Sequence, residues 1–446
     1  MTAIDEIAAN EASLSAEVES VLAAAKRAGA TDAEVSASQS TGLEVVVRRQ
    51  DIETLEYTRH HRLSITVYLG QQKGSASTAD SSPEAVERTV RAALNIARHT
   101  QADEYSGLVA AELMAGSRPE LDLLHPWDID ASGAEALALT CEAAALEVPG
   151  VFDTEGAAVG SDLVTGVYGN SNGFIGVHSG SRHSMSCAAL AQDDRGKQRD
   201  YAMSMVRDPA ALDDAASLGR EAGELTAAHL GVGTVPTGTM PVLFTPRMTR
   251  TLVSHLLDAM SGGSIYRNAS FLKDQLGEPV TAAHFSLQEK PQLPGALGSR
   301  YHDGDGVATR EQFFIREGEL CSYLLGGYSA RRLGLETTGN AGGAHNVCLT
   351  GRTLTVGEMM AEMGDGVLVT SLMGQGVNIV NGDFSRGARG YRIAGGEVAH
   401  PIDEFTIAAN LKDMYMNIVA LGDDVNREGN IQAPSMLVSD MTVAGR

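Results

Sequence analysis

Apolar residues near the start of the chain follow first a helical and then a strand-like period. Val18, Val21 and Ala25 lie three or four positions apart, as the buried stripe of an amphipathic helix does. This spacing predicts a helix over residues 15–30. After it, apolar and polar residues alternate in short stretches, which predict a meander of strands at 33–37, 42–47, 52–58 and 63–68 with a turn at 70–74.

The following segments again combine helices and strands. Ser82, Pro83 and Glu84 provide an N-cap, a first-turn proline and a charge that complements the helix dipole, so a helix is predicted from this point. Residues 102–133 show little periodicity, which indicates a connector. Further helices are predicted at 134–148 and 212–229, and strands at 166–178, 181–191 and 200–206 are expected to form a second antiparallel sheet.

Clustered glycines separate short β-rich runs beyond Met240. The clusters are at 262–263, 304–306, 326–327, 339–343 and 387–390, a spacing typical of tight turns in an antiparallel sheet that folds on itself. Thr355 and Glu358 have the spacing of a capping box. The methionines at 359, 360 and 363 behind this box are expected to fill the core of a short helix.

These patterns predict an α+β protein in three segments. Residues 1–100 are expected to form a two-layer antiparallel sheet with helices. Residues 101–235 are expected to contain the connector and the second sheet, either alone or as one unit with 1–100. Residues 236–446 are expected to form a glycine-rich, barrel-like domain of mainly antiparallel strands, and the stretch 231–238 is the predicted linker.

Charge and cysteine usage narrow the possible partners. The 446 residues include 57 acidic and 34 basic side chains, which gives a net charge of −23. Such a chain repels phosphate backbones and anionic headgroups, so neither nucleic acid nor a membrane is an expected partner. The four cysteines form no CxxC pair and the N-terminal residues lack a secretory pattern, so a cytoplasmic protein is expected.

Sequence motifs for metal or phosphate binding are missing. None of the twelve histidines is followed by glutamate, so HExxH and HExxxH are both absent. The glycine-rich segment 339–346 has neither the ending of a P-loop nor a Rossmann turn. Asp303 begins a run that resembles half a calcium loop, but Phe314 stands at its twelfth position, which favours a tight turn.

Several longer motifs resemble those of one known family and extend over nearly the whole chain. They are Gly74–Asp80 (GSASTAD), Ser82–Ala85 (SPEA), Asp305–Arg310 (DGVATR), Gly326–Gly334 (GGYSARRLG), Thr338–Gly343 (TGNAGG), His345–Asn346, Leu372–Val377 (LMGQGV), Gly382–Ala388 (GDFSRGA) and Asn410–Met414 (NLKDM). On these residues the chain resembles the TldD/PmbA family, and specifically its PmbA (TldE) branch.

This resemblance implies one subunit of a two-subunit zinc peptidase. In that family one type of subunit carries HExxxH and a later cysteine as zinc ligands, and the PmbA type shares the fold without this site. The corresponding positions here are His255, Leu256, Met260 and Ala433, three of which lack a group that binds zinc or accepts a proton. No catalytic residue, metal ligand or cofactor is therefore expected in this chain. His255 is expected to be a helix histidine, hydrogen-bonded at the edge of the core.

The resemblance favours a non-catalytic subunit that pairs with a zinc-bearing TldD-like paralogue. Such a complex would degrade or process short, unfolded peptides such as peptide precursors and antitoxins. Residues expected along the peptide path or at the interface are Tyr266, Arg267, Tyr328, Arg331, His345, Asn346 and Arg386. Two alternatives remain: a self-contained hydrolase with an unrecognised site around Tyr328, Arg331, His345 and Arg386, and a homodimeric peptide-binding module.

Overall fold

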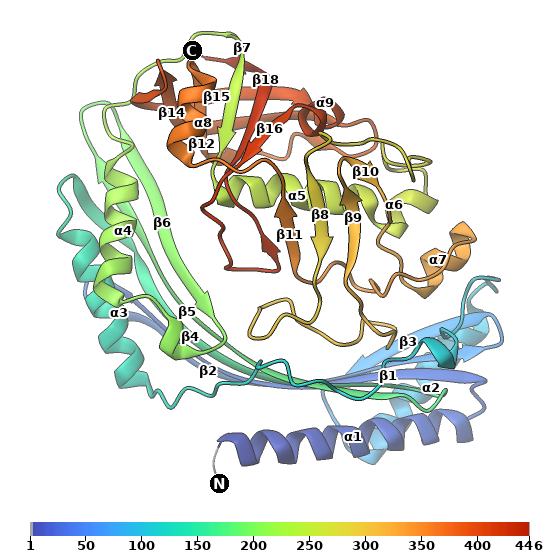
Figure 1. Ribbon diagram of the computed structural model, residues 1–446. Coiled ribbons are helices and arrows are strands. Elements are labelled where there is room, and N and C mark those ends of the chain that lie inside the picture. Colours follow the sequence, from blue (N-terminus) through green and yellow to red (C-terminus); the bar gives the residue numbers. More distant parts are fainter. Residues whose placement is uncertain (1–2, 446) are drawn as a thin grey trace.

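The computed structural model describes residues 3–445, and its N-terminal part is built on one long, curved six-stranded sheet (Figure 1). All neighbours in the order β3-β2-β1-β4-β5-β6 are antiparallel. The strands are β1 (Asp32–Arg48), β2 (Asp51–Leu69), β3 (Gln72–Thr78), β4 (Val151–Asn170), β5 (Ile175–Gln192) and β6 (Lys197–Val206). The prediction of a second sheet is wrong, because β4 pairs with β1 and the later strands continue the first sheet.

Long hairpins replace the short predicted strands. The meander expected at 33–68 consists of only two strands, β1 and β2, joined at Arg49 and Gln50, which both have positive φ. Polar residues that interrupt the hydrophobic alternation stay in the ladder, as where Ser40 pairs with His60. Backbone hydrogen bonds hold these positions together without apolar side chains, so the hydrophobic pattern marked the buried parts of each strand but not its length. For the same reason the chain turns at 171–174 between β4 and β5, not at 178–181.

Four helices cover one face of the sheet, and the C-terminal part faces the other (Figure 1). They are α1 (Ala3–Arg27), α2 (Pro83–His99), α3 (Ala131–Leu146) and α4 (Ala215–Ala227). On β1, Val35 packs with α1 and α2, whereas Val45 packs with α3 and α4. Both positions are odd-numbered, and alternate residues of a strand point to opposite faces, so the two helix pairs share a face. The predicted N-cap Ser82 is confirmed, since its Oγ accepts a hydrogen bond from the Ala85 N–H.

The larger C-terminal sheet closes into a barrel. Its closed circuit runs through β12, β7, β18, β15 and β14, because β14 pairs with β12 as well as with β15. The strands of this sheet are β7 (Gly238–Phe244), β12 (Gly366–Met373), β13 (Val377–Asn378), β14 (Asp383–Ala394), β15 (Glu397–Asn410), β16 (Ile418–Leu421) and β18 (Met436–Ala444). β7 and β12 are parallel and the other pairs are antiparallel. The α+β, barrel-like prediction is confirmed.

A smaller five-stranded sheet lies beside the barrel in the order β10-β9-β8-β11-β17 (Figure 1). Its strands are β8 (Ser286–Glu289), β9 (Gln312–Arg316), β10 (Glu319–Leu320), β11 (Val347–Thr350) and β17 (Ile431–Gln432). The helices of this half are α5 (Pro246–Met260), α6 (Gly262–Tyr266), α7 (Gly327–Leu333), α8 (Val356–Met363) and α9 (Leu411–Met416). α5 contacts both the barrel and β17, and one hydrophobic core joins them.

The short helix α8 has the predicted ends and core residues. Thr355 and Glu358 form the reciprocal capping box. Met359 and Met363 are buried as expected, whereas Met360 is only partly buried and packs against the same cluster. Within residues 3–445, no helix is both long and apolar enough to cross a membrane.

Candidate functional site

A groove of about 560 Å³ runs beside the C-terminal half of α5. Ser254, Leu257, Asp258 and Ser261 line it from the helix and its C-cap. Residues three or four positions apart share one face of a helix, so this face of α5 looks into the groove. The residues that α5 and its C-cap contribute are small or polar except for Leu257, which leaves room for a ligand that approaches the helix surface.

The glycine-rich loop 340–344 and the edge strand β17 form further walls of the groove. Gly342 and Gly343 have φ values of 98° and 115°, a backbone conformation that L side chains rarely adopt. Ile431 of β17 also lines the groove. Bare main chain and a sheet edge are surfaces to which an extended peptide can hydrogen-bond.

Two tyrosines line the groove, and an arginine packs against one of them. The rings of Tyr266 and Tyr328 meet edge to face at 5.8 Å, and the Arg267 guanidinium lies 5.2 Å from the Tyr266 ring. The Tyr328 hydroxyl donates a 2.6 Å hydrogen bond to Asp103, which raises the pKa of the phenol and lowers the pKa of Asp103. The structure thus brings together three of the predicted residues, from α6 and α7.

Arg331 lies on the same helix as Tyr328 but points away from the groove into the connector. Its guanidinium donates to the backbone carbonyls of Tyr105, Gly107 and Leu108 at 2.7–3.3 Å. It therefore fixes the connector to α7, next to the Tyr328 contact with Asp103.

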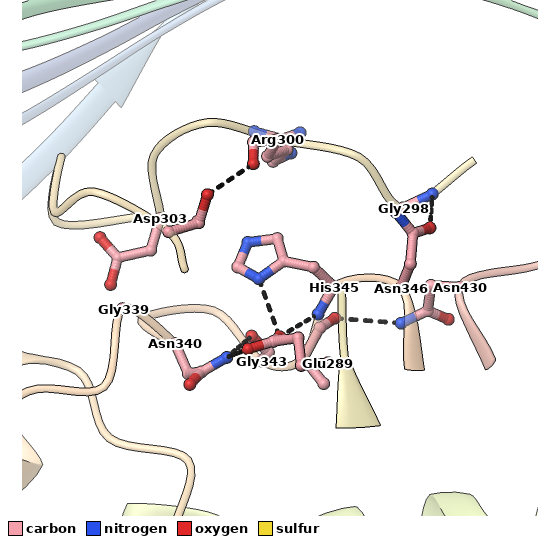
Figure 2. Close-up of polar contacts among 12 residues, drawn as sticks. Glu289, Gly298, Arg300, Asp303, Gly339, Asn340, Gly343, His345, Asn346 and Asn430 are labelled. Atoms are coloured by element: carbon pink, nitrogen blue, oxygen red, sulfur yellow. Dashed lines mark hydrogen bonds and ion pairs between the residues drawn. The ribbon is translucent and has the colours of Figure 1, made fainter. Parts of the chain in front are cut away.

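A buried carboxylate, Glu289, lies directly beneath the loop 340–344 and holds it (Figure 2). Its Oε1 accepts hydrogen bonds from the His345 N–H at 2.7 Å, His345 Nδ1 at 3.0 Å and Asn340 Nδ2 at 2.8 Å. Its Oε2 accepts from Gln312 Nε2 at 2.7 Å and again from Asn340. Burial raises the pKa of Glu289, but the hydrogen bonds from His345 and Gln312 outweigh it and hold the pKa below its ordinary value.

His345 and Asn346 are buried beneath the groove wall and do not line the groove. The Asn346 amide donates to the Lys290 carbonyl and to Ser299 Oγ, and its Oδ1 accepts from the Gly298 N–H. Figure 2 shows both side chains turned toward the neighbouring loops. They brace the wall of the groove.

His255 and Arg386 lie together on another side of α5. Burial and the nearby Arg386 charge lower the pKa of His255. Arg386 donates to the carbonyls of Leu372 and Met373 and offers no acceptor. The expected hydrogen bond of His255 is therefore wrong: within the described chain its buried Nε2 has no partner. Tyr328 and Arg331 thus both contact the connector and line one cavity, whereas His345 and Arg386 each lie in other surroundings.

The residues at the positions that would hold zinc do not fit this metal. Leu256, Met260 and Ala433 are at most 1% exposed and belong to one hydrophobic core. Zinc in proteins takes thiolate, imidazole or carboxylate ligands, and these side chains supply none. Throughout residues 3–445, no three His, Cys, Asp or Glu side chains gather in a way that could hold a metal ion.

The sequence did not identify Glu289 as a site residue, and for Asp303 it predicted a tight turn but not the contact with the glycine-rich loop. Asp303 Oδ1 accepts hydrogen bonds from the Asp305 and Val307 N–H groups, and Oδ2 accepts from Ala341 of the glycine-rich loop. Burial, together with the charge of Asp305, raises the pKa of Asp303 to about 6. Glu289 is a single acidic residue at the end of the short strand β8, and it gives no sequence signal because its partners come from distant loops.

Comparison with protein families places the chain in a class of metallopeptidases. Three family models match successive parts of the chain: PmbA/TldA metallopeptidase domain 1 at 33–97, the central domain at 124–230 and the C-terminal domain at 237–445. The chain belongs to the PmbA/TldD metallopeptidase family, and the resemblance inferred from the motifs is confirmed.

The most similar relatives include metalloproteases from two bacteria. The chain is 40% identical over 415 residues to the metalloprotease PmbA of Escherichia coli O157:H7, which covers 93% of this chain and 92% of that protein. It is also 40% identical over 424 residues to the metalloprotease PmbA homolog of Haemophilus influenzae, which covers 94% of each.

Solved structures show the same fold. A putative modulator of DNA gyrase from Bacteroides thetaiotaomicron superposes with a TM-score of 0.91 at 23% identity, covering 96% of this chain and 98% of its own. TldE from Thermococcus kodakarensis superposes with a TM-score of 0.81 at 20% identity, covering 96% and 100%.

Proposed function

We propose that this chain is the zinc-free subunit of a heteromeric metallopeptidase and binds short or unfolded peptides in the groove beside α5. One observation carries the proposal: Leu256 and Met260 are buried in the core on a helix whose other face lines an open groove. Such a chain can bind and orient a peptide, but its side chains at these two positions neither bind zinc nor accept a proton from water.

The walls of the groove support a peptide ligand. The edge strand β17 and the glycine-rich loop expose main chain, which binds peptides through backbone hydrogen bonds with little regard for sequence. Tyr266 and Tyr328 add an aromatic surface for side chains. Peptide precursors and labile antitoxins are substrates of this unfolded kind.

The proposed partner is a zinc-bearing paralogue of the TldD type. It supplies the metal and the hydrolysis, and this chain supplies binding surface. The proposed location is the cytoplasm, where the four free cysteines stay reduced.

The test begins with the chain purified alone and then mixed with its zinc-bearing paralogue. We expect far less than one zinc per chain, no cleavage of an unfolded peptide by the chain alone, and cleavage by the mixture. Stoichiometric zinc in the isolated chain, or its turnover of peptide in the presence of a chelator, would contradict the proposal and favour a self-contained hydrolase.

A groove variant separates peptide binding from assembly. Ser254→Trp fills the groove and is expected to weaken binding of the peptide, whereas Ser20→Trp on the exposed side of α1 is the matched control. Light scattering of the chain with and without the paralogue distinguishes the heteromer from a homodimer. A homodimer that never binds the paralogue would favour the peptide-binding module.

A further inference from the structure

A second cavity, of about 520 Å³, lies between the six-stranded sheet and loops of the C-terminal part. Three arginines line it: Arg182 from β5, Arg207 from the end of β6, and Arg300 from the loop before β9. A smaller cavity of about 250 Å³ adjoins it, shares His178 and Arg300 as lining residues, and adds Arg118. Four arginines therefore line two adjoining cavities in a chain whose net charge is −23.

Two of these arginines are neutralised by carboxylates. Arg182 lies 3.3 Å from Asp162, and Arg118 lies 2.8 Å from Glu11. The remaining acidic lining residue, Glu120, accepts a hydrogen bond from the N–H of residue 122.

The other two arginines have no carboxylate partner. Arg207 donates to the carbonyls of Ser181 and Leu297, and its buried Nε has no partner in the described chain. The Arg300 guanidinium has neither a hydrogen bond nor an ion pair within residues 3–445. Figure 2 shows Arg300 on the loop above the Glu289 network, on the side toward the six-stranded sheet.

The pKa values of the groups that line the cavity agree with an excess of positive over negative charge there. Burial, with the charges of Arg300 and Arg182, lowers the pKa of Arg207 to about 10. Burial lowers the pKa of His178, and the charges of Arg300, His302, Arg118 and Arg207 lower it further, so its ring is neutral at neutral pH. Among the described residues, Arg207 is half-buried and its Nε faces no acceptor, whereas Arg300 is exposed and has no counterion, so an anion bound between them would pair with both guanidinium groups.

The position of the cavity selects the kind of anion. Asn430 lines both this cavity and the groove beside α5, so the two spaces meet at that residue. A peptide that extends along the groove can therefore place an end or a side chain between Arg207 and Arg300. A nucleic acid is a poor fit, because a long polyanion would have to approach a strongly acidic chain to reach the cavity.

We infer that the cavity lined by Arg182, Arg207 and Arg300 binds a carboxylate group of the peptide whose main chain lies in the groove. The inference rests on the proposed function, because it assigns a second contact to the same ligand. Guanidinium groups bind carboxylates through paired, charge-assisted hydrogen bonds, and Arg300 has all its donors free to do so. The carboxylate comes from the peptide C-terminus or from an acidic side chain near it.

The test measures binding of fluorescein-labelled unstructured peptides to the full chain by anisotropy. One peptide has a free C-terminal carboxylate, the second is amidated, and the third is amidated but carries a glutamate next to its end. Arg300→Gln removes the charge, Arg300→Lys keeps it, and Arg220→Gln on the exposed side of α4 is the matched control.

We expect the two carboxylate peptides, or one of them, to bind at least tenfold more tightly than the plain amidated peptide. Arg300→Gln should abolish this preference, Arg300→Lys should restore part of it, and Arg220→Gln should leave it intact. The preferred peptide identifies the source of the carboxylate. Equal binding of all three peptides, unchanged in Arg300→Gln, would overturn the carboxylate site and leave the proposed function standing.

Loss of all peptide binding would instead count against the proposed function, and the cavity is then tested with small anions. N-acetylglycine should raise the melting temperature of the wild type but not of Arg300→Gln. A larger, Arg300-dependent shift with inorganic phosphate would overturn the inference in favour of a phosphoryl ligand, and no shift with either anion would overturn it outright.

Discussion

Replacing Glu289 by glutamine removes one buried charge without changing the shape of the side chain. The carboxylate is 1% exposed and accepts hydrogen bonds from the backbone and ring of His345, from Asn340 and from Gln312. In the variant one oxygen becomes an NH₂ group. Whichever oxygen is replaced, this NH₂ group then faces N–H donors.

The size of the effect follows from the bonds at each oxygen. If the NH₂ group replaces Oε2, the bond from Gln312 Nε2 is lost, and Gln312 cannot simply turn its amide because Nε2 also donates to the Thr338 carbonyl. If it replaces Oε1, both contacts of His345 are lost. Hydrogen bonds to a charged group contribute about 1.5–3 kcal/mol each, so we expect a loss of about 3 kcal/mol.

Urea unfolding at pH 7 and hydrogen exchange of segment 339–346 measure the change. Glu289→Gln should lower the unfolding midpoint and speed exchange in this loop. The control Glu311→Gln replaces an exposed glutamate next to Gln312 in the sequence and should change neither quantity. The pKa of Glu289 is lowered in the fold, so its contribution is present at neutral pH and shrinks as the pH falls below the ordinary value of 4.5. An unchanged midpoint with unchanged exchange would refute the idea that this carboxylate holds the loop.

Three further predictions concern other contacts. A Cβ at Gly219 of α4 would lie 1.9 Å from the Cys141 carbonyl oxygen of α3, so Gly219→Ala should destabilise the protein by about 1–3 kcal/mol. In Gly357→Ala of α8 the added Cβ meets no atom within 4 Å, so this variant should be slightly more stable than the wild type. Thermal unfolding measures both changes. Because the pKa of Asp303 is raised to about 6, its ionisation costs stability as the pH rises from 4 to 7. The unfolding free energy of the wild type relative to Asp303→Asn should therefore fall by about 2 kcal/mol over that range, and a constant difference would contradict this. Arg331→Gln should speed hydrogen exchange at 105–108 much more than elsewhere, and unchanged exchange there would show that its three carbonyl contacts do not hold the connector.

The hydrophobic pattern predicted the class of the fold and several helix ends, but not how the sheet continues. Ser82 and Thr355 are local capping signals, and both were confirmed because a cap depends on residues within one turn. The pairing of β1 with β4 joins residues more than one hundred positions apart, for example Val45 with Val159. No local pattern encodes such a pairing, so one long sheet looked like two.

In the candidate site, too, the sequence motifs located some features but did not show which motif residues line the groove. The glycine-rich motifs correctly marked the loop that borders the groove, and Tyr266 and Tyr328 line that groove. His345 belongs to the same motif, yet it is bound to Glu289 beneath the loop and lies outside the groove. A motif residue can thus act by holding main chain in place for a ligand that it does not touch. Arg300 shows the opposite: it lies outside the family motifs, yet its guanidinium lines a cavity. This cavity forms only where the loop and the six-stranded sheet come together, so the sequence alone does not reveal it.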